Sequence, residues 1–209
     1  LVKIIDVKDD LGNTSRVSAV YTAAPRDSFI IALKDFKAIW EINYSDDPPV
    51  IYRGYVHDYK MGEGIAEKGP FPVRHILLDD YLDDFFFDQS YQHLIGASRN
   101  SQQGQVINLI VGRKIADIDL PGMPHLGSGI TWPYKDTTVL ASPNLREGVI
   151  SIIDTGTWKT IKKITTDGPG FFMRSHENSA YAWVDVFVGP NKDVMHIIEL
   201  EKPDGIIVQ

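Results

Sequence analysis

The chain contains no cysteine among its 209 residues. Without thiols it can form neither a disulfide nor a thiolate nucleophile, and it cannot bind zinc or an iron–sulfur cluster through cysteine. It also lacks the C-x-x-C-H motif by which a c-type haem is attached. Because some periplasmic proteins simply lack cysteine, this absence leaves the compartment open.

Long apolar runs and basic clusters are missing as well. No stretch of about 18 apolar residues occurs, so no membrane span is expected. The chain has 21 Lys and Arg against 28 Asp and Glu, a net charge of -7, and its basic residues are scattered. Nucleic acid is therefore not an expected partner, because its recognition needs a basic patch or stripe. The N-terminal residues LVKIIDVKDD have no initiator Met, no basic region and no cleavage site, and we expect a fragment of a longer chain.

The chain is rich in short β-branched and aromatic runs separated by turn residues. Three of them open the chain, RVSAVYTA (16–23), SFIIAL (28–33) and AIWEINY (38–44). Such runs are typical of β-strands. The strand pattern returns throughout the rest of the sequence, which predicts an all-β protein.

The runs also recur with a longer period. QVINLIVGRKIADIDLPG (105–122) and GVISIIDTGTWKTIKKITTDG (148–168) both contain an apolar strand, a turn and an amphipathic outer strand. A period of about 40 to 45 residues with four strands per repeat is typical of β-propeller blades. We therefore predict that residues 1–209 form a partial β-propeller of roughly four four-stranded blades, from a ring of about eight, with an insertion at about 45–78. A pair of β-sandwiches is the alternative fold. An exposed strand edge would favour a homodimer.

One histidine lies in an unusual turn, GMPHLGSGITW (122–132), just before a β-prone run. In a propeller, loops at the start of the innermost strands line the central ligand site. The segment GPGFFMRSHENSAYAWVD places Arg174 and His176 at the corresponding position of the next blade. His125 is the candidate catalytic residue and iron ligand, because an imidazole can ligate iron or donate a proton. The candidate cofactor-binding residues are His125, Gly127, Ser128, Trp132, Arg174 and His176.

The glycines of these segments favour the interpretation that a bulky ligand binds here. Without side chains they would let the backbone approach a planar group; they are Gly127, Gly129, Gly168 and Gly170. Each candidate also has an ordinary structural interpretation. A histidine in a turn is more often solvated or hydrogen-bonded than functional, and a Trp on a strand is usually core. Arg174 has possible ion-pair partners in Glu177 and Asp185.

Four motifs follow one another in the chain: LDDFFFDQSYQHLIGASRN, PGMPHLGSGITW, LASPNLREGVISIID and GPGFFMRSHENSAYAWVD. In this order they resemble the C-terminal part of the d-type haem β-propellers of the cytochrome cd nitrite reductases and their relatives. The resemblance runs from about Arg16 to the end of the chain. It implies d-type haem as cofactor, denitrification as the pathway and a periplasmic location.

The resemblance places His125 where the family has a distal-side histidine. The reductases have a second distal histidine, expected here on RVSAVYTAAPRDSF, where Thr22, Ala23 and Ala24 stand instead; Ser128 occupies a position where they tend to carry Arg. Nitrite reduction needs proton delivery and a held anion, and loss of one imidazole weakens both. This departure favours the NirN-like branch, in which the haem is substrate or cargo. Such proteins oxidise dihydro-haem d by removing two electrons and two protons from a propionate side chain.

The resemblance implies an oxidoreductase in the full-length protein, with a c-type haem only in a missing N-terminal part. The expected partners are d-type haem or its dihydro precursor, with nitrite reductase as the acceptor of the haem. Two alternatives remain, a nitrite reductase fragment and a non-catalytic interaction scaffold in which His125 is a structural turn residue. A haem site needs an apolar slot with few convergent cations, whereas a scaffold has polar loops over the mouth.

Overall fold

The computed structural model describes residues 1–209 except 10, 54–64, 68, 99, 101–102 and 204–209. The regular structure of the described residues is antiparallel β-sheet with short 3-10 turns, η1 (Ala24–Arg26) and η3 (Leu126–Ser128). None of the helices described is long and apolar enough to cross a membrane. The chain divides into two compact units, Leu1–Leu82 and Asp83–Gln209. The all-β class and the four-stranded antiparallel blade are confirmed.

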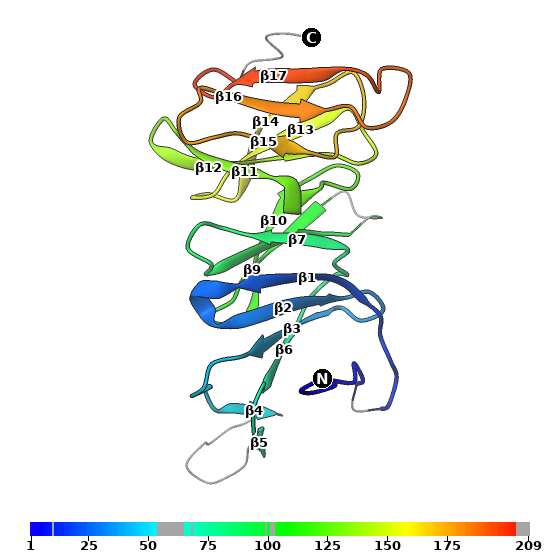
Figure 1. Ribbon diagram of the computed structural model, residues 1–209, viewed down its shortest axis with the longest axis vertical. Helices are drawn as coiled ribbons and strands as arrows, with labels where there is room; N and C mark the ends of the chain where they lie inside the picture. The colour runs from blue at the N-terminus through cyan, green and yellow to red at the C-terminus, as the bar shows by residue number, and fades with distance from the viewer. Residues whose placement is uncertain (10, 54–64, 68, 99, 101–102, 204–209) are drawn as a thin grey trace. The chain divides into compact units, whose positions relative to one another are not determined.

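The first unit contains one blade-like sheet. Its strands are β1 (Val17–Ala23), β2 (Ser28–Leu33), β3 (Ala38–Asn43) and β6 (Val73–Leu77), hydrogen-bonded in that order (Figure 1). The first three strands coincide with the predicted β-prone runs. Buried apolar side chains of β2, β3 and β6 form a core of this unit.

An insertion separates β3 from β6. It contains a short hairpin of β4 (Ile51–Arg53) and β5 (Ile65–Glu67). The predicted insertion at 45–78 extends too far, because Val73 and Ile76 are buried and β6 pairs with β3 as the fourth strand of the blade. Residues 54–64 and 68, which the prediction includes, lie outside the described residues.

The second unit begins with a four-stranded meander. The strands are β7 (Asp84–Phe87), β8 (His93–Ala97), β9 (Gln103–Asn108) and β10 (Arg113–Asp119), and each pairs with the next in the sequence. The innermost strand β7 comes first in the chain and the outermost strand β10 comes last.

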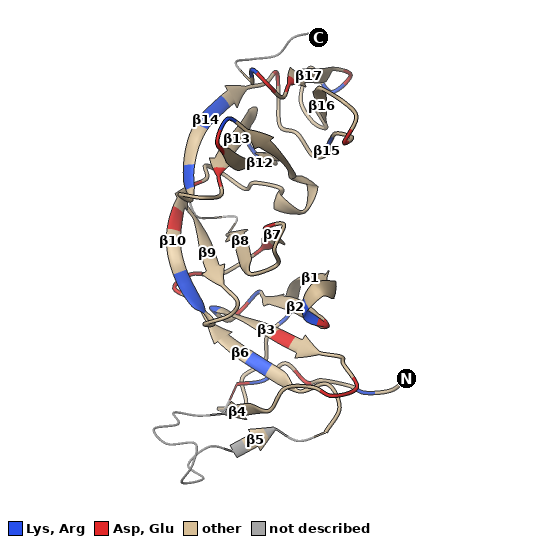
Figure 2. Ribbon diagram, turned by 90° about the vertical axis from the view of Figure 1, so that its left-hand side faces the viewer, with Lys and Arg blue, Asp and Glu red and all other residues tan. Residues whose placement is uncertain are grey.

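The next sheet repeats this order. It consists of β11 (Ile130–Tyr134), β12 (Thr137–Pro143), β13 (Val149–Asp154) and β14 (Lys159–Thr165) (Figure 1). The outermost strands of both meanders alternate between exposed and partly buried positions, and Figure 2 shows Lys and Arg along β10 and β14. The middle strands β8, β9, β12 and β13 are buried over most of their length.

The last sheet has three strands in the described part of the chain. These are β15 (Met173–Arg174), β16 (Tyr181–Asp185) and β17 (Met195–Glu199). The prediction gave four strands to every blade, and the described residues of this sheet provide three.

Two shared cores hold the sheets of the second unit together. One joins the first and second meanders, with Ile95 and Val106 facing Leu140 and Ile153. The other joins the second meander to the last sheet. Its buried members are Trp132, Val139, Ala141, Ile150, Ile152, Ile164, Met173, Ala182, Val184 and Ile198. Because these cores align consecutive sheets face to face, the starts of their innermost strands lie next to one another.

Candidate functional site

The turn that carries His125 is held against the loop after β12. Gly122 has φ +61°, and a Cβ there would lie 2.9 Å from Asn144 Oδ1. The Asn144 side-chain amide donates to the Pro121 carbonyl, and Pro124 forms a β-bridge with Asn144. The backbone N–H of His125 donates to the Pro143 carbonyl at 2.8 Å. The turn is therefore fixed by its backbone, and His125 caps η3 just before the innermost strand β11.

The imidazole of His125 is half-buried and makes one hydrogen bond through its ring. Its Nδ1 lies 2.6 Å from the carbonyl oxygen of Phe171, and its ring packs against the Phe171 ring at 4.3 Å between centroids. A carbonyl oxygen only accepts hydrogen bonds, so Nδ1 carries the proton. In the neutral ring, Nε2 then has the lone pair. No described residue hydrogen-bonds Nε2, which leaves this nitrogen able to bind a metal or accept a proton.

Aromatic rings from the neighbouring sheet lie beside this histidine. Phe171 contacts Phe172 at 4.7 Å and Phe187 at 5.4 Å between ring centroids. Phe172 and Phe187 are 55% and 41% exposed, although such residues are usually buried. The imidazole is therefore flanked by an apolar, partly open surface that suits a flat ligand.

Arg174 adds a positive charge to the same region. Its guanidinium Nη1 donates to the Ser128 Oγ at 3.2 Å, and the carbonyl oxygens of Ser128 and Met173 lie 3.3 and 2.7 Å away. Arg174 is exposed, and no ion pair with Glu177 or Asp185 forms among the described residues. The cation is tied by neutral acceptors, so its charge remains available to an anionic group.

Ser128 and Gly127 connect the turn to the sheets on either side. Ser128 is 1% exposed, and its Oγ also accepts a hydrogen bond from the Met173 N–H at 3.2 Å. The Gly127 N–H donates to Asp84 Oδ2 at 3.3 Å, at the start of β7. The turn thus bridges the starts of three innermost strands. Ser128 holds Arg174 in place, and its predicted contact with a cofactor stays a prediction.

Trp132 and His176 have contacts of their own, apart from those of the other candidates. Trp132 is 7% exposed within the core and donates from Nε1 to the Leu200 carbonyl at 3.0 Å. His176 is exposed, and its Nδ1 accepts a hydrogen bond from the Asn178 N–H at 3.1 Å. Both line a hollow of about 630 Å³ that contains none of His125, Ser128 or Arg174. The structure therefore links His125, Gly127, Ser128 and Arg174 through one turn and its hydrogen bonds, and no hydrogen bond or ring contact among the described residues joins Trp132 or His176 to them.

Three of the glycines do not make room for a ligand as we expected. A Cβ on Gly129 would lie 2.9 Å from the Ala141 carbonyl oxygen, and one on Gly168 would lie 2.6 Å from Val186 Cγ1. A Cβ on Gly170 would lie 3.0 Å from the Asp185 carbonyl oxygen. These positions need glycine because neighbouring protein strands pass close by.

The strand on which we expected a second distal histidine does not belong to the sheet directly before β11. The sheet directly before β11 in the chain begins with β7, whereas RVSAVYTAAPRDSF contains β1 of the first unit. The residues leading into β7, LDDYLDD (78–84), also contain no histidine. Asp84, at the start of β7, contacts the His125 turn through the Gly127 N–H. Sequence reasoning missed it, because an acidic residue before an apolar strand has no distinctive pattern.

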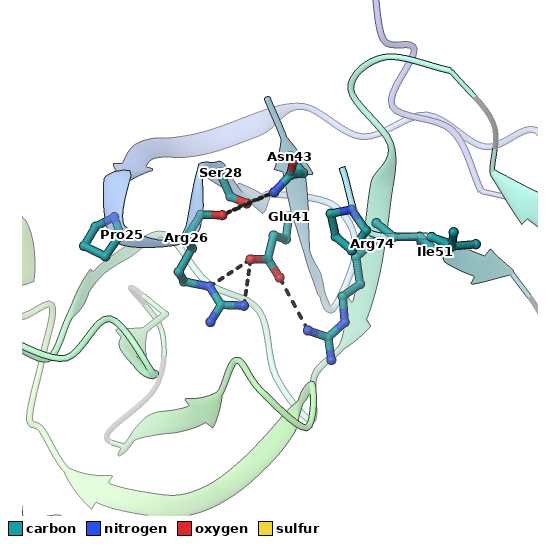
Figure 3. A pocket seen from close by; sticks show the side chains of 9 residues that line it. Pro25, Arg26, Ser28, Glu41, Asn43, Ile51 and Arg74 are labelled. Carbon is teal, nitrogen blue, oxygen red and sulfur yellow. Dashed lines mark hydrogen bonds and ion pairs between the residues drawn. The ribbon is translucent and has the colours of Figure 1, made fainter. Parts of the chain in front are cut away.

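A second hollow, of about 410 Å³, lies in the first unit and was not anticipated (Figure 3). Glu41 lies between two guanidinium groups there. Arg26 Nε and Nη2 each lie 2.8 Å from Glu41 Oε1, and Arg74 Nη1 lies 3.5 Å from Oε2. The three residues come from η1, β3 and β6, so no local sequence pattern links them.

Comparison with known proteins gives consistent results. The family model described as the Cytochrome D1 heme domain matches residues 1–207. The chain is 46% identical over 199 residues to the Dihydro-heme d1 dehydrogenase of Pseudomonas aeruginosa PAO1, covering 95% of this chain and 36% of that protein.

Two solved structures are also similar. Dihydro-heme d1 dehydrogenase NirN in complex with DHE matches with a TM-score of 0.84 and 44% identity, over 100% of this chain and 40% of that one. Kuenenia stuttgartiensis hydrazine synthase matches with a TM-score of 0.63 at 11% identity, over 100% of this chain and 51% of that one, which shows a shared fold. The chain thus spans well under half of the NirN-type relatives that it matches. By the family match over nearly its whole length and by its close relatives, this chain belongs to the cytochrome d1 haem domain family.

Proposed function

We propose that this chain is the haem-holding part of a NirN-like oxidoreductase that acts on a dihydro form of d-type haem during its maturation. The observation that carries the proposal is the imidazole of His125, whose Nδ1 is held by the Phe171 carbonyl while Nε2 has no partner among the described residues. The identity of 46% to a dihydro-haem dehydrogenase supports the same branch. The intact protein's activity is proposed, because the chain covers 36% of that relative.

The residues present fit a flat, acidic tetrapyrrole. Phe172 and Phe187 offer exposed ring surface, Arg174 offers a guanidinium suited to carboxylates, and His125 Nε2 offers a lone pair for the iron or for a proton. When bound, the haem supplies the redox centre and the side chain to be oxidised. Oxidation of such a side chain releases protons, and in this proposal His125 Nε2 accepts one of them.

The electrons must leave through a group outside this chain. Covalent attachment of a c-type haem requires cysteine, and the sequence has none. We therefore assign the c-type haem to another part of the protein. A periplasmic location and transfer of the product to nitrite reductase belong to the same proposal. Association into a homodimer remains a prediction.

Binding of d-type haem by the His125→Ala variant tests this function. Wild-type protein is titrated with d-type haem while the visible spectrum is recorded. The alanine variant should change the absorption bands or weaken affinity at least several-fold, and it should keep its fold because His125 contributes one half-buried turn side chain.

His176→Ala is the matched control. It also removes an imidazole, but His176 lines the other hollow, which contains none of His125, Ser128 or Arg174. Its spectrum should equal that of the wild type. The proposal is wrong if the wild type does not bind the haem, or if His125→Ala binds it with unchanged affinity and spectrum.

A further inference from the structure

Asp185, at the end of β16, lies behind the segment that holds His125. Its Oδ1 accepts hydrogen bonds from the backbone N–H groups of Phe171 and Phe172, both at 2.8 Å. Its own N–H donates to the Phe172 carbonyl at 3.2 Å. Hydrogen bonds to a charged acceptor are stronger than neutral ones, so this carboxylate holds the Phe171–Phe172 backbone in place.

A single peptide group connects this carboxylate to the imidazole. The carbonyl of Phe171 and the N–H of Phe172 belong to the same planar unit. The N–H donates to Asp185 Oδ1, and the carbonyl oxygen accepts from His125 Nδ1 at 2.6 Å. Hydrogen bonds in such a chain polarise one another, so the anion at one end makes the carbonyl at the other a stronger acceptor.

The electronic consequence reaches the free nitrogen of the ring. A stronger acceptor at Nδ1 favours the tautomer with the proton on Nδ1 and increases electron density at Nε2. Carboxylates that bind a ligating histidine directly have the same effect, fixing the tautomer and raising the basicity of the ligand. Here the carboxylate acts across one intervening peptide.

We propose that Asp185 is a positioning residue that acts through the Phe171–Phe172 peptide to keep the proton of His125 on Nδ1 and the lone pair on Nε2. Asp185 makes no contact with a reacting atom in this scheme. That Nε2 binds iron or accepts a proton rests on the proposed function, whereas the tautomer of the His125 ring does not depend on it.

Other charged groups around the turn lack such a connection. Asp84 approaches from β7 and bonds the Gly127 N–H, and Arg174 approaches from β15 and bonds Ser128. Neither contacts a ring nitrogen of His125. Among the described residues, the hydrogen-bonded path from the imidazole to a carboxylate therefore runs through Phe171 and Phe172 to Asp185.

The local sequence permits this approach. The loop before β15 passes so close to β16 that a Cβ on Gly170 would lie 3.0 Å from the Asp185 carbonyl oxygen. Glycine at this position lets the Phe171 and Phe172 amides reach the carboxylate. Gly170, which we expected to make room for a ligand, therefore allows the hydrogen bonds between Asp185 and the Phe171–Phe172 backbone.

The test is nitrogen NMR of the haem-free protein with ¹⁵N-labelled histidine, because it reports the tautomer without activity or haem. The His125 signals are assigned by their loss in His125→Gln. At a pH where the ring is neutral, wild-type His125 should show a protonated Nδ1 and an unprotonated Nε2. Asp185→Asn keeps an oxygen acceptor for the two amides and removes the charge, so it should raise the population of the Nε2–H tautomer several-fold.

Two further variants make the result decisive. Asp154→Asn removes the same charge from the end of another strand, where the carboxylate bonds Thr137 and Gly156; it should leave His125 unchanged. Asp185→Ala removes the acceptor as well and should shift the tautomer at least as far as Asp185→Asn. If only the alanine variant shifts it, Asp185 is a structural acceptor and the proposal is wrong.

Folding failure does not protect the proposal. If the Asp185 variants do not fold, the wild type still tests the proposal, because a proton on Nε2 in the neutral ring overturns it. The outcome is also separate from the proposed function. If the protein shows the expected tautomer but does not bind d-type haem, the proposed function is wrong and the role of Asp185 is not contradicted. If it binds d-type haem but shows the other tautomer, only the role of Asp185 is contradicted.

Discussion

In this protein single carboxylates accept hydrogen bonds that hold turns and loops in place. At Asp154 these hydrogen bonds change the pKa of the carboxyl group. Asp154 ends β13, where its Oδ1 accepts from the Thr137 hydroxyl at 2.6 Å and from the Gly156 N–H at 2.8 Å. These bonds, that from Thr137 above all, lower the pKa of Asp154 below its ordinary value of 3.8 even though burial opposes them. They stabilise the charged form.

We predict that Thr137→Val raises the pKa of Asp154 toward 3.8, because the largest cause of the lowering is lost. The folded pKa lies below the unfolded one, so the stabilisation is present above about pH 4 and is lost as pH falls through the folded pKa. The variant should therefore lose less stability on acidification than the wild type.

Carboxyl NMR titration and unfolding at several pH values measure both effects. Thr138→Val is the control, since no hydrogen bond joins its hydroxyl to Asp154 among the contacts described. An unchanged pKa in Thr137→Val would contradict the assignment.

At the scale of elements, the blade of the first unit is tied together by Glu41. The side chain on β3 is 8% exposed and joins Arg26 after β1 to Arg74 on β6 (Figure 3). Removing one partner of a buried ion pair leaves charge without compensation, which is far more costly than loss of an exposed pair.

We predict that Glu41→Gln lowers the free energy of unfolding by about 3 kcal/mol. Urea denaturation of the two proteins measures the change. Asp35→Asn is the control, because it breaks the exposed ion pair with Arg16 and should have a clearly smaller effect. Equal midpoints for both variants would show that the Glu41 cluster does not stabilise the blade.

The strands were predictable from the sequence because short β-branched and aromatic runs are separated by turn residues. The runs that became β1, β2 and β3 have strong β-prone composition between turn residues. β6 was missed because it follows an insertion and therefore lies outside the regular spacing of the repeats.

The candidate site was only partly predictable. His125 was found because its turn combines proline and glycine before a strand. Its partner is a backbone carbonyl 46 residues further along the chain, which leaves no mark on the sequence. Trp132 and His176 were grouped with it because their distance along the sequence from the predicted turns does not tell which contacts their side chains make.

For the whole molecule, the absent thiols limit the activity of this chain alone. We predict no reduction of nitrite with an artificial electron donor and added d-type haem, because the chain lacks the c-type haem motif and the residues leading into β7 contain no second histidine. Nitrite consumption is the measurement, with a cytochrome cd nitrite reductase as positive control. Turnover by this chain would contradict the NirN-like assignment.

The bond between His125 and Phe171 joins two sheets that are also held by a shared core. Its integrity therefore depends on the cooperative docking of those sheets as well as on the two residues. A fluctuation that separates β15 and β16 from the second meander breaks the bond and frees the ring to change tautomer. A ligand that needs the ordered imidazole binds only the molecules in which these sheets are packed together, and it increases the fraction of such molecules. Core substitutions far from the histidine will then raise the apparent dissociation constant in inverse proportion to the fraction of molecules in which the sheets stay docked.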